Sequence, residues 1–263
     1  MTGRQLARVS AIKYHETLWS ELYPGNQHTL HCLRPAVLAT ESSLELALAQ
    51  RQRTVWRLDG GAGTDEHFQW LLNRGYQIMG KGKSNFRANA LAAQAKRWDA
   101  YDDYELAEVS SPVDYGRPVR VFLKRRQKKE QWHHSYYLST LALPSKGHFM
   151  RYYHQRGGAE VEQFRQDKHG LDLATRRKYR FAAQQGFILL TDLTHNLLAD
   201  FYHQALIGSR FETFGLRRIV RHLLNIPGRL VFEGSQLRRI ELLTLNQNAD
   251  DLIFCLKKYI SGE

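Results

Sequence analysis

The sequence predicts a layered α/β protein. A short strand over 54–58 ends at Asp59, a glycine-rich turn and a helix follow it, and a second strand covers 76–79. This order of strand, loop, helix and strand is typical of α/β folds, in which ligand sites gather where the strands end. With 263 residues, 43% of them hydrophobic, the chain is long enough for one large domain or two small ones.

The elements around this unit can be placed from local signals. Residues 5–12 alternate loosely as a strand does and have no lead-in before them, which indicates a reading frame that opens inside a domain. Apolar residues recur through 28–50 and predict one or two helices. Thr64 is placed to cap a helix with an acidic first turn, and Ser84 to cap an alanine-rich helix that runs to about Trp98.

After residue 98 the pattern changes to strands. Two β-like runs, 119–123 and 135–141, enclose the basic residues 124–129, and together they predict a hairpin whose tip can contact a DNA backbone. The alternative for such a tip is a solvated loop. We therefore divide the chain into a partial core at 1–98, a β-rich insertion at 99–146 and a helical, basic part at 147–263.

The last part is predicted to begin with a helix over 147–168 that is interrupted at Gly157 and Gly158. The longest apolar-periodic segment, 177–206, predicts a second helix, which we expect in the core. A terminal β-hairpin is expected to turn at 233–235.

Charge and cysteine content indicate which classes of function suit the chain. Lysine and arginine number 38 against 26 acidic residues, a net charge of +12, and a polyanionic partner explains this excess better than solubility alone. Cys32 and Cys255 stand in no metal-ligand spacing, so neither a disulfide framework nor a zinc module is indicated, which suits a reducing cytosol. No export signal and no membrane span is predicted.

Two acidic residues have settings suited to phosphodiester chemistry, in which carboxylates hold divalent ions that stabilise the attacking and leaving oxygens. Asp59 follows a strand and precedes glycines that let a backbone approach closely. Taken alone, its position is better explained as the beginning of the cap of the next helix. In the second segment, Tyr153, Arg156 and Glu160 share one helical face, to which Asp167 also belongs. Glu162 points to the opposite side.

These segments resemble the insertion-sequence DDE transposases. The tyrosine, arginine and glutamate spacing resembles their glutamate-bearing helix, and residues 57–61 resemble the strand that carries their second aspartate. The resemblance implies a ribonuclease-H-like core with a β-rich insertion and C-terminal helices, with Mg²⁺ or Mn²⁺ held by Asp59 and Glu160. It also implies that the residues facing DNA include Tyr153, Arg156, Lys168 and Lys81.

The chain departs from the family in two places. Asp167 stands where the family has a lysine, with Lys168 one position later, and this leaves Glu162 as the alternative to Glu160. The first aspartate should precede Asp59, yet residues 1–58 contain glutamates at 16, 21, 41 and 45 and no aspartate. The resemblance therefore describes an N-terminally truncated transposase that is expected to be inactive alone.

The leading hypothesis is accordingly the C-terminal part of a DDE-type transposase. It would act on double-stranded DNA at transposon ends, as a possible homodimer, in the bacterial cytoplasm with the nucleoid. The alternative is a non-catalytic DNA-binding remnant of a mobile element. An acid/base glycosidase that uses the same two carboxylates fits less well, because the tryptophans do not cluster. We expect His195 to be a packed histidine and not a catalytic base.

Overall fold

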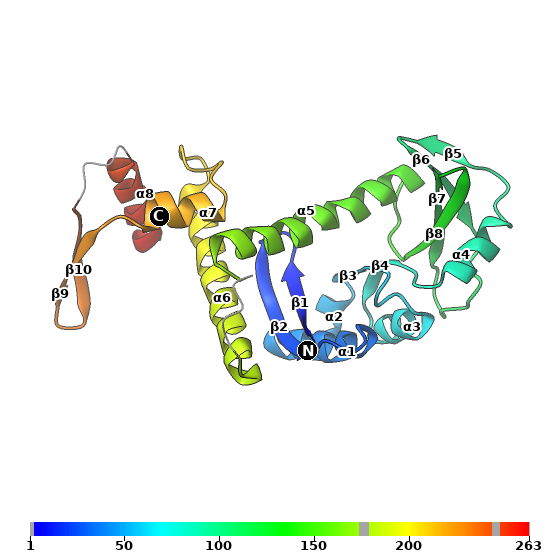
Figure 1. Cartoon of the computed structure of the whole chain (residues 1–263), viewed down its shortest axis with the longest axis horizontal. Helices are drawn as coiled ribbons and strands as arrows, with labels where there is room; N and C mark the ends of the chain where they lie inside the picture. The colour runs from blue at the N-terminus through cyan, green and yellow to red at the C-terminus, as the bar shows by residue number, and fades with distance from the viewer. Residues whose placement is uncertain (1–2, 174–178, 244–247, 263) are drawn as a thin grey trace. The chain divides into compact units, whose positions relative to one another are not determined.

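The computed structural model describes residues 3–173, 179–243 and 248–262, with the side chains of 156–161 also outside the described set (Figure 1). The chain divides into two compact units. Unit 1 consists of Met1–Ala7 and Tyr23–Gly157, and unit 2 of Arg8–Leu22 and Gly158–Glu263. The predicted class, a mixed α/β protein, is confirmed.

Unit 1 is built around a six-stranded sheet with the strand order β3-β4-β8-β7-β6-β5. Its strands are β3 Val55–Leu58, β4 Gln77–Lys81, β5 Asp99–Tyr101, β6 Tyr104–Val109, β7 Arg120–Lys128 and β8 Gln131–Ser139. Its helices are α1 Leu30–Ser43, α2 Leu48–Arg51, α3 Asp65–Asn73, α4 Asn85–Ala92 and the first part of α5 Lys146–Gly170.

Strands β3 and β4 pair in parallel and, with α3 between them in the chain, form the strand-helix-strand unit that the sequence predicts. Val55 lies opposite Gln77 and Leu58 opposite Gly80, so both carboxyl ends meet at one edge. The expected caps are present, because the Thr64 and Ser84 side chains accept hydrogen bonds from the backbone N–H groups of His67 and Arg87.

The strands of residues 99–146 extend this same sheet. β8 pairs antiparallel with β4, and β7, β6 and β5 follow in antiparallel order. The expected basic hairpin is the β7-β8 pair, but its turn is shorter than predicted, because residues 124–128 of the expected tip belong to strand β7. Lys128 faces Gln131 across Lys129 and Glu130, both with positive φ. A two-residue turn of this kind matches the twist of the strands.

Unit 2 contains the two-stranded β1-β2 sheet and a second set of helices. Its strands include the second half of β1 Arg4–Ala11, most of β2 Glu16–Pro24, and the hairpin of β9 Gly228–Glu233 and β10 Gln236–Leu242. Its helices include the second part of α5, α6 Phe181–Phe201, α7 Leu216–Arg218, α8 Ala249–Ser261, and the π-helical turns η1 Tyr202–Leu206 and η2 Ile219–Leu224. Its apolar cluster joins the end of α6 to η2 and α8 through Phe201, Leu223 and Leu252.

Several elements differ from the prediction. Helix α4 ends at Ala92, before Trp98, because the indole of Trp98 packs against the core of unit 1 and β5 begins at the next residue. Strand β2 and helix α8 were not predicted. Within the described residues, we find no helix with the length and apolarity needed to span a membrane.

The largest difference concerns α6, for which the sequence predicts a place in the core. Leu190, Leu193 and Leu197 of this helix are 64%, 57% and 56% exposed, whereas Asp192 and His195 are buried. The covered face carries the polar residues together with Ile188, Leu198 and Phe201, so only part of the apolar period enters the core.

Candidate functional site

Asp59 is the first residue after β3, at the edge where the parallel strands β3 and β4 both end. Its side chain is exposed, and its Oδ1 atom accepts a hydrogen bond of 2.9 Å from the backbone N–H of Gly61. This turn presents the carboxylate at the carboxyl end of a strand, which is where α/β folds place their ligand sites. The predicted position of Asp59 at a strand end is therefore found in the structure.

The glycines after Asp59 allow the turn to pack against the end of β4. A Cβ atom on Gly63 would lie 1.8 Å from the carbonyl oxygen of Lys81, closer than any side chain permits. The backbone N–H of Lys83 donates to the carbonyl of Gly63 at 2.9 Å and fixes this approach. Glycine is required at position 63 because the two backbones touch there.

Two lysines lie beside this turn. Lys81 is half-buried, and its aliphatic stem passes 3.5 Å from the position of a Cβ atom on Gly60. Lys83 is exposed, and its Nζ lies 2.9 Å from Nε2 of His28. The edge therefore combines one exposed carboxylate with two ammonium groups, a set of charges that suits a phosphate oxygen near a carboxylate-bound cation.

The first half of α5 is fixed to the end of β3 at Arg57 and Leu58. The hydroxyl of Tyr153 donates to the carbonyl of Leu58 at 3.3 Å, and Nη1 of Arg57 donates to the carbonyl of Tyr152 at 3.1 Å. The Tyr153 ring is 5% exposed and packs edge-on against Tyr137 at 4.9 Å. Tyr153 thus positions the helix, and its buried ring differs from the DNA-facing role expected from the sequence.

The other predicted residues of α5 have different settings. Arg156 and Glu160 belong to the helix, and their side chains lie outside the described residues. The alternative carboxylate, Glu162, accepts a 2.8 Å hydrogen bond from Arg165, which lowers the pKa of Glu162. Lys168 is exposed in the last turn of the helix.

The described residues do not assemble a metal centre by themselves. Among them, no group of three or more histidines, cysteines, aspartates or glutamates is close enough to hold an ion. Of the glutamates that precede Asp59, Glu41 is engaged inside unit 1, where it accepts from Tyr76 at 2.8 Å and pairs with Arg74. Asp59 is the described member of the expected pair, and the side chain of Glu160 lies outside the described residues, so we derive no catalytic step through a metal.

The basic hairpin divides into an engaged part and an exposed tip. The guanidinium of Arg125 lies between the rings of Trp98 and Trp132, at 4.3 and 4.4 Å, and pairs with Glu105. Lys128, Lys129 and the turn between the strands are exposed. The tip is the part of this run that is placed for a backbone phosphate contact.

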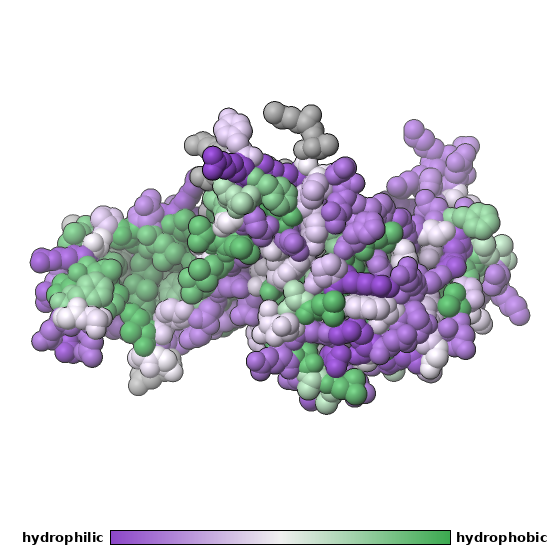
Figure 2. All heavy atoms as spheres, turned by 90° about the horizontal axis from the view of Figure 1, so that it is seen from below, coloured by the Kyte–Doolittle hydropathy of each residue, from purple (hydrophilic) through white to green (hydrophobic). Residues whose placement is uncertain are grey.

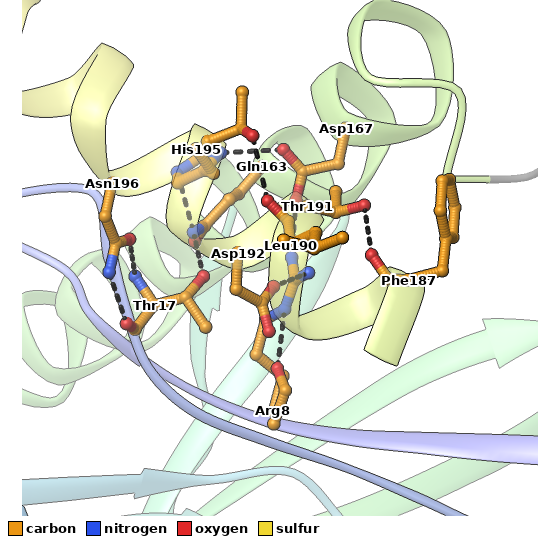
Figure 3. A network of polar contacts seen from close by, with 12 residues as sticks. Arg8, Thr17, Gln163, Asp167, Phe187, Leu190, Thr191, Asp192, His195 and Asn196 are labelled. Atoms are coloured by element: carbon orange, nitrogen blue, oxygen red, sulfur yellow. Dashed lines mark hydrogen bonds and ion pairs between the residues drawn. The ribbon is translucent and has the colours of Figure 1, made fainter. Parts of the chain in front are cut away.

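In unit 2, Asp167 is at the centre of a buried ionic network (Figure 3). Its carboxylate is fully buried and accepts from Nη1 of Arg8 at 2.5 Å and from Nδ1 of His195 at 2.7 Å. The second guanidinium nitrogen of Arg8 pairs with Asp192. The helical wheel puts Asp167 on the face of Tyr153, whereas the structure assigns it to the interior of unit 2, where a buried charge requires a partner.

The network raises the pKa of His195. Burial opposes the imidazolium, yet the hydrogen bond and the charge of Asp167 outweigh it and raise the pKa of His195. Its Nε2 atom lies 2.6 Å from the carbonyl oxygen of His15, so both ring nitrogens have acceptors. This agrees with the expectation of a packed histidine, since neither nitrogen is available as a base.

Two amide side chains of α6 complete the hydrogen bonds of strand β2. Asn196 accepts from the N–H of Thr17 and donates to the carbonyl of Thr17, both at 2.8 Å. Gln185 accepts from the N–H of Leu22 at 2.6 Å and donates to the carbonyl of Ser20 at 3.3 Å. Eleven helical residues rise about 16.5 Å, and five strand residues span roughly the same length. The helix therefore runs along the strand with matched spacing, a relation that a single sequence does not reveal.

A cavity of about 310 Å³ opens beside this network. His15, His195 and His203 line it together with Glu162 and Glu212. Burial lowers the pKa of His15, and the neighbouring imidazoles of His203 and His195 act in the same direction. His15 is therefore neutral at physiological pH.

Comparison with known proteins adds no family to this description: no protein-family model matches the chain, and no curated protein matches it either.

Proposed function

We propose that the chain is a DNA-binding protein of the DDE-transposase type, with a ribonuclease-H-like core in unit 1. In this proposal Asp59 and Glu160 are the second and third carboxylates, and Mg²⁺ or Mn²⁺ would be held by them when bound. The metal would supply Lewis-acid stabilisation of the phosphodiester oxygens. The DNA substrate would be the end of a mobile element.

The observation that carries the proposal is the hydrogen bond from Tyr153 to the carbonyl of Leu58. It joins the helix of the tyrosine, arginine and glutamate pattern to the residue directly before Asp59. The two sequence segments that resemble the transposases, 95 positions apart at this contact, thus meet at one strand end. Nothing in the spacing of either segment required this.

Electrostatics support a DNA partner. The net charge of +12 favours polyanions, and Lys81 and Lys83 stand beside Asp59. In the proposed complex these lysines neutralise phosphates next to the carboxylate, and the exposed tip at Lys128 and Lys129 contacts the backbone farther along. These contacts would position the duplex without reading its sequence.

The alternative is a non-catalytic DNA-binding remnant. It is favoured by one observation: residues 1–58 contain no aspartate, the residue that the transposase resemblance places before Asp59. The two proposals predict the same DNA affinity and differ only in whether Asp59 holds a metal.

DNA binding can be tested by fluorescence anisotropy with a labelled duplex of about 30 base pairs, long enough for several phosphate contacts, over a series of KCl concentrations. If Lys83 contacts a phosphate, Lys83→Gln should reduce the salt slope by about 0.9. Lys257→Gln removes the same charge from an exposed position on α8 and should leave the slope unchanged. Absence of binding, or an equal change in both variants, would overturn the proposal.

The metal role can be tested by Mn²⁺ binding, measured by electron paramagnetic resonance, and by Mn²⁺-dependent nicking of supercoiled plasmid. Asp59→Asn should weaken Mn²⁺ binding about tenfold or more while DNA affinity is retained. Asp114→Asn is the matched control, because exposed Asp114 accepts from the N–H of Gly116 at 2.8 Å in the same kind of turn. Equal Mn²⁺ binding in all three proteins would leave the remnant as the function.

A further inference from the structure

The turn that joins β1 to β2, residues 12–15, is held by two histidines of the helical part of unit 2. The Nε2 atom of His195 on α6 lies 2.6 Å from the carbonyl oxygen of His15, and Nε2 of His203 in η1 lies 3.1 Å from the carbonyl oxygen of Tyr14. The rings of His15 and His203 are stacked, with their centroids 6.2 Å apart. Two neighbouring carbonyl groups of the turn are therefore bound by imidazoles that follow 180 and 189 positions later in the chain.

The conformation of this turn depends on such contacts. His15 has a φ of 57°, in the left-handed region that residues with a Cβ atom seldom occupy, and a conformation of this kind persists where the surroundings hold it. His15 also lines the cavity of about 310 Å³, so the turn forms part of the cavity wall. The imidazole of His195 reaches the turn because α6 directs polar side chains into unit 2, whereas hydrophobic side chains gather on the outside of the part that holds α6, α8 and the C-terminal hairpin (Figure 2).

The Nε2 atom of His195 has two neighbours that make opposite demands. It lies 2.6 Å from the carbonyl oxygen of His15, which is an acceptor, and 2.9 Å from Nε2 of Gln163, which is a donor. The Nδ1 atom keeps its hydrogen, because it lies 2.7 Å from the buried carboxylate of Asp167. The imidazolium can therefore donate to His15, whereas the neutral ring accepts from Gln163 and directs a lone pair at the carbonyl oxygen of His15.

We propose that His195 is a proton-controlled latch. With a proton on Nε2 it holds the 12–15 turn closed against the cavity, and after loss of that proton it binds Gln163 and releases the turn. The bond to Asp167 is kept in both states, so the ring stays in place and only the turn moves. The proposal does not depend on the DNA-binding function.

The charged and titratable groups around His195 come from every element packed against it. Burial lowers its pKa, but the hydrogen bond and the charge of Asp167 on α5 outweigh burial and the opposing charge of Arg8 on β1, so that the pKa is raised. The remaining groups are Asp192 of α6, which pairs with Arg8, His15 of the turn, His203 of η1, and Glu162 and Glu212, which line the cavity.

The direction of the switch follows from this balance. Because the pKa of His195 is raised above 6.5, the latch is closed below that pH and opens as pH rises through the pKa of the folded state. Burial lowers the pKa of His15, as do the imidazoles of His203 and His195, so His15 is neutral over the range in which the latch opens. The opening is therefore assigned to His195 and not to the ring that it holds.

The test is limited trypsin digestion of the full chain from about pH 6 to about pH 9, with the fragments measured by mass spectrometry. Cleavage after exposed Lys13 reports the open turn, and cleavage after Lys129, in the exposed turn of β7-β8, cancels the pH dependence of the protease. The ratio of Lys13 to Lys129 cleavage should rise about tenfold or more with pH, because the turn loses a hydrogen bond to a charged group. Cleavage after Lys257 on α8, which reports unfolding of unit 2, should not rise with it.

Three variants separate the latch from a structural contact. His195→Gln removes the titrating ring, and its ratio should not depend on pH. His203→Gln is the matched control, because it makes the same change at the other imidazole that binds the turn, and its ratio should still rise at the wild-type pH. Gln163→Met removes the donor that stabilises the neutral ring, so the rise should move to higher pH.

The outcomes that would overturn the proposal are distinct. They are a wild-type ratio that does not change with pH, a parallel rise of cleavage after Lys257, and a pH-dependent ratio in His195→Gln. If His195→Gln does not fold, Gln163→Met decides, since a rise that stays at the wild-type pH or moves lower would show that Nε2 of His195 does not exchange between the two partners.

Discussion

Replacement of Asp167 by asparagine should show how much the buried network contributes to unit 2. The carboxylate accepts from Arg8 at 2.5 Å and from His195 at 2.7 Å, and it is fully buried. Asparagine has one acceptor oxygen, and its NH₂ group would face a donor. Removal of one partner from a buried ion pair costs about 3–5 kcal/mol, a large part of the roughly 5–15 kcal/mol that stabilises a typical protein.

Glu162→Gln is the matched control on the same helix. It makes the same change from carboxylate to amide, but the side chains of Glu162 and its partner Arg165 are 40% and 66% exposed. Ion pairs in that environment contribute about 0–1 kcal/mol. The difference between the variants therefore isolates burial, with the chemical change held constant.

The assay is urea unfolding followed by far-ultraviolet circular dichroism, with hydrogen exchange measured on peptides from α6. Asp167→Asn should lower the midpoint and speed exchange along α6, and Glu162→Gln should do neither. The reasoning is refuted if the two variants differ by less than about 1 kcal/mol in free energy of unfolding, because the loss of one of the two carboxylate partners of buried Arg8 would then be tolerated.

Three further predictions concern pH and glycine. Because the pKa of His195 is raised, the protonated imidazole stabilises the fold fully below the ordinary pKa of 6.5, and this contribution is lost as pH rises through the raised pKa of the folded state. The urea midpoint of the wild type should therefore decrease as pH rises above 6.5, and the midpoint of His195→Gln should not. Gly63→Ala should lower the free energy of unfolding by about 1–3 kcal/mol or more, because the added Cβ atom would contact the backbone of Lys81. Gly186→Ala, in open space on α6, should raise the free energy of unfolding by about 1 kcal/mol. Equal shifts of the thermal unfolding midpoint in the two variants would contradict both predictions. Glu130→Gly should increase the free energy of unfolding by about 0.5–1 kcal/mol, since φ is 65° there, and no change would mean that the turn is unstrained.

Local signals in the sequence were sufficient for much of unit 1. Thr64 and Ser84 cap helices because the cap depends on residues only three positions away. The β3-α3-β4 order and the basic hairpin were recovered for the same reason. The position of Asp59 could be predicted because a glycine-rich turn directly after a short strand is typical of the strand ends where α/β folds hold ligands.

The network of unit 2 could not be predicted in this way. Arg8 and Asp167 are 159 positions apart, and nothing in either neighbourhood indicates the other. The helical wheel of α5 places Asp167 near the face of Tyr153, but a wheel assumes one environment along the whole helix. Helix α5 passes from unit 1 to unit 2 at residue 157, and each part is held by a different kind of core.

The prediction that α6 lies in the core was wrong for Leu190, Leu193 and Leu197 for the same reason, because the contacts that orient the helix come from distant parts of the chain. An apolar period indicates which side chains share a face, and it does not indicate which face will be covered. Here Asn196 and Gln185 hold the edge of β2, and Asp192 neutralises Arg8, so burial of the polar face is favoured by hydrogen bonds that the chain can make only there. Leu190, Leu193 and Leu197 are left exposed as a result, although Leu198 of the same helix is buried.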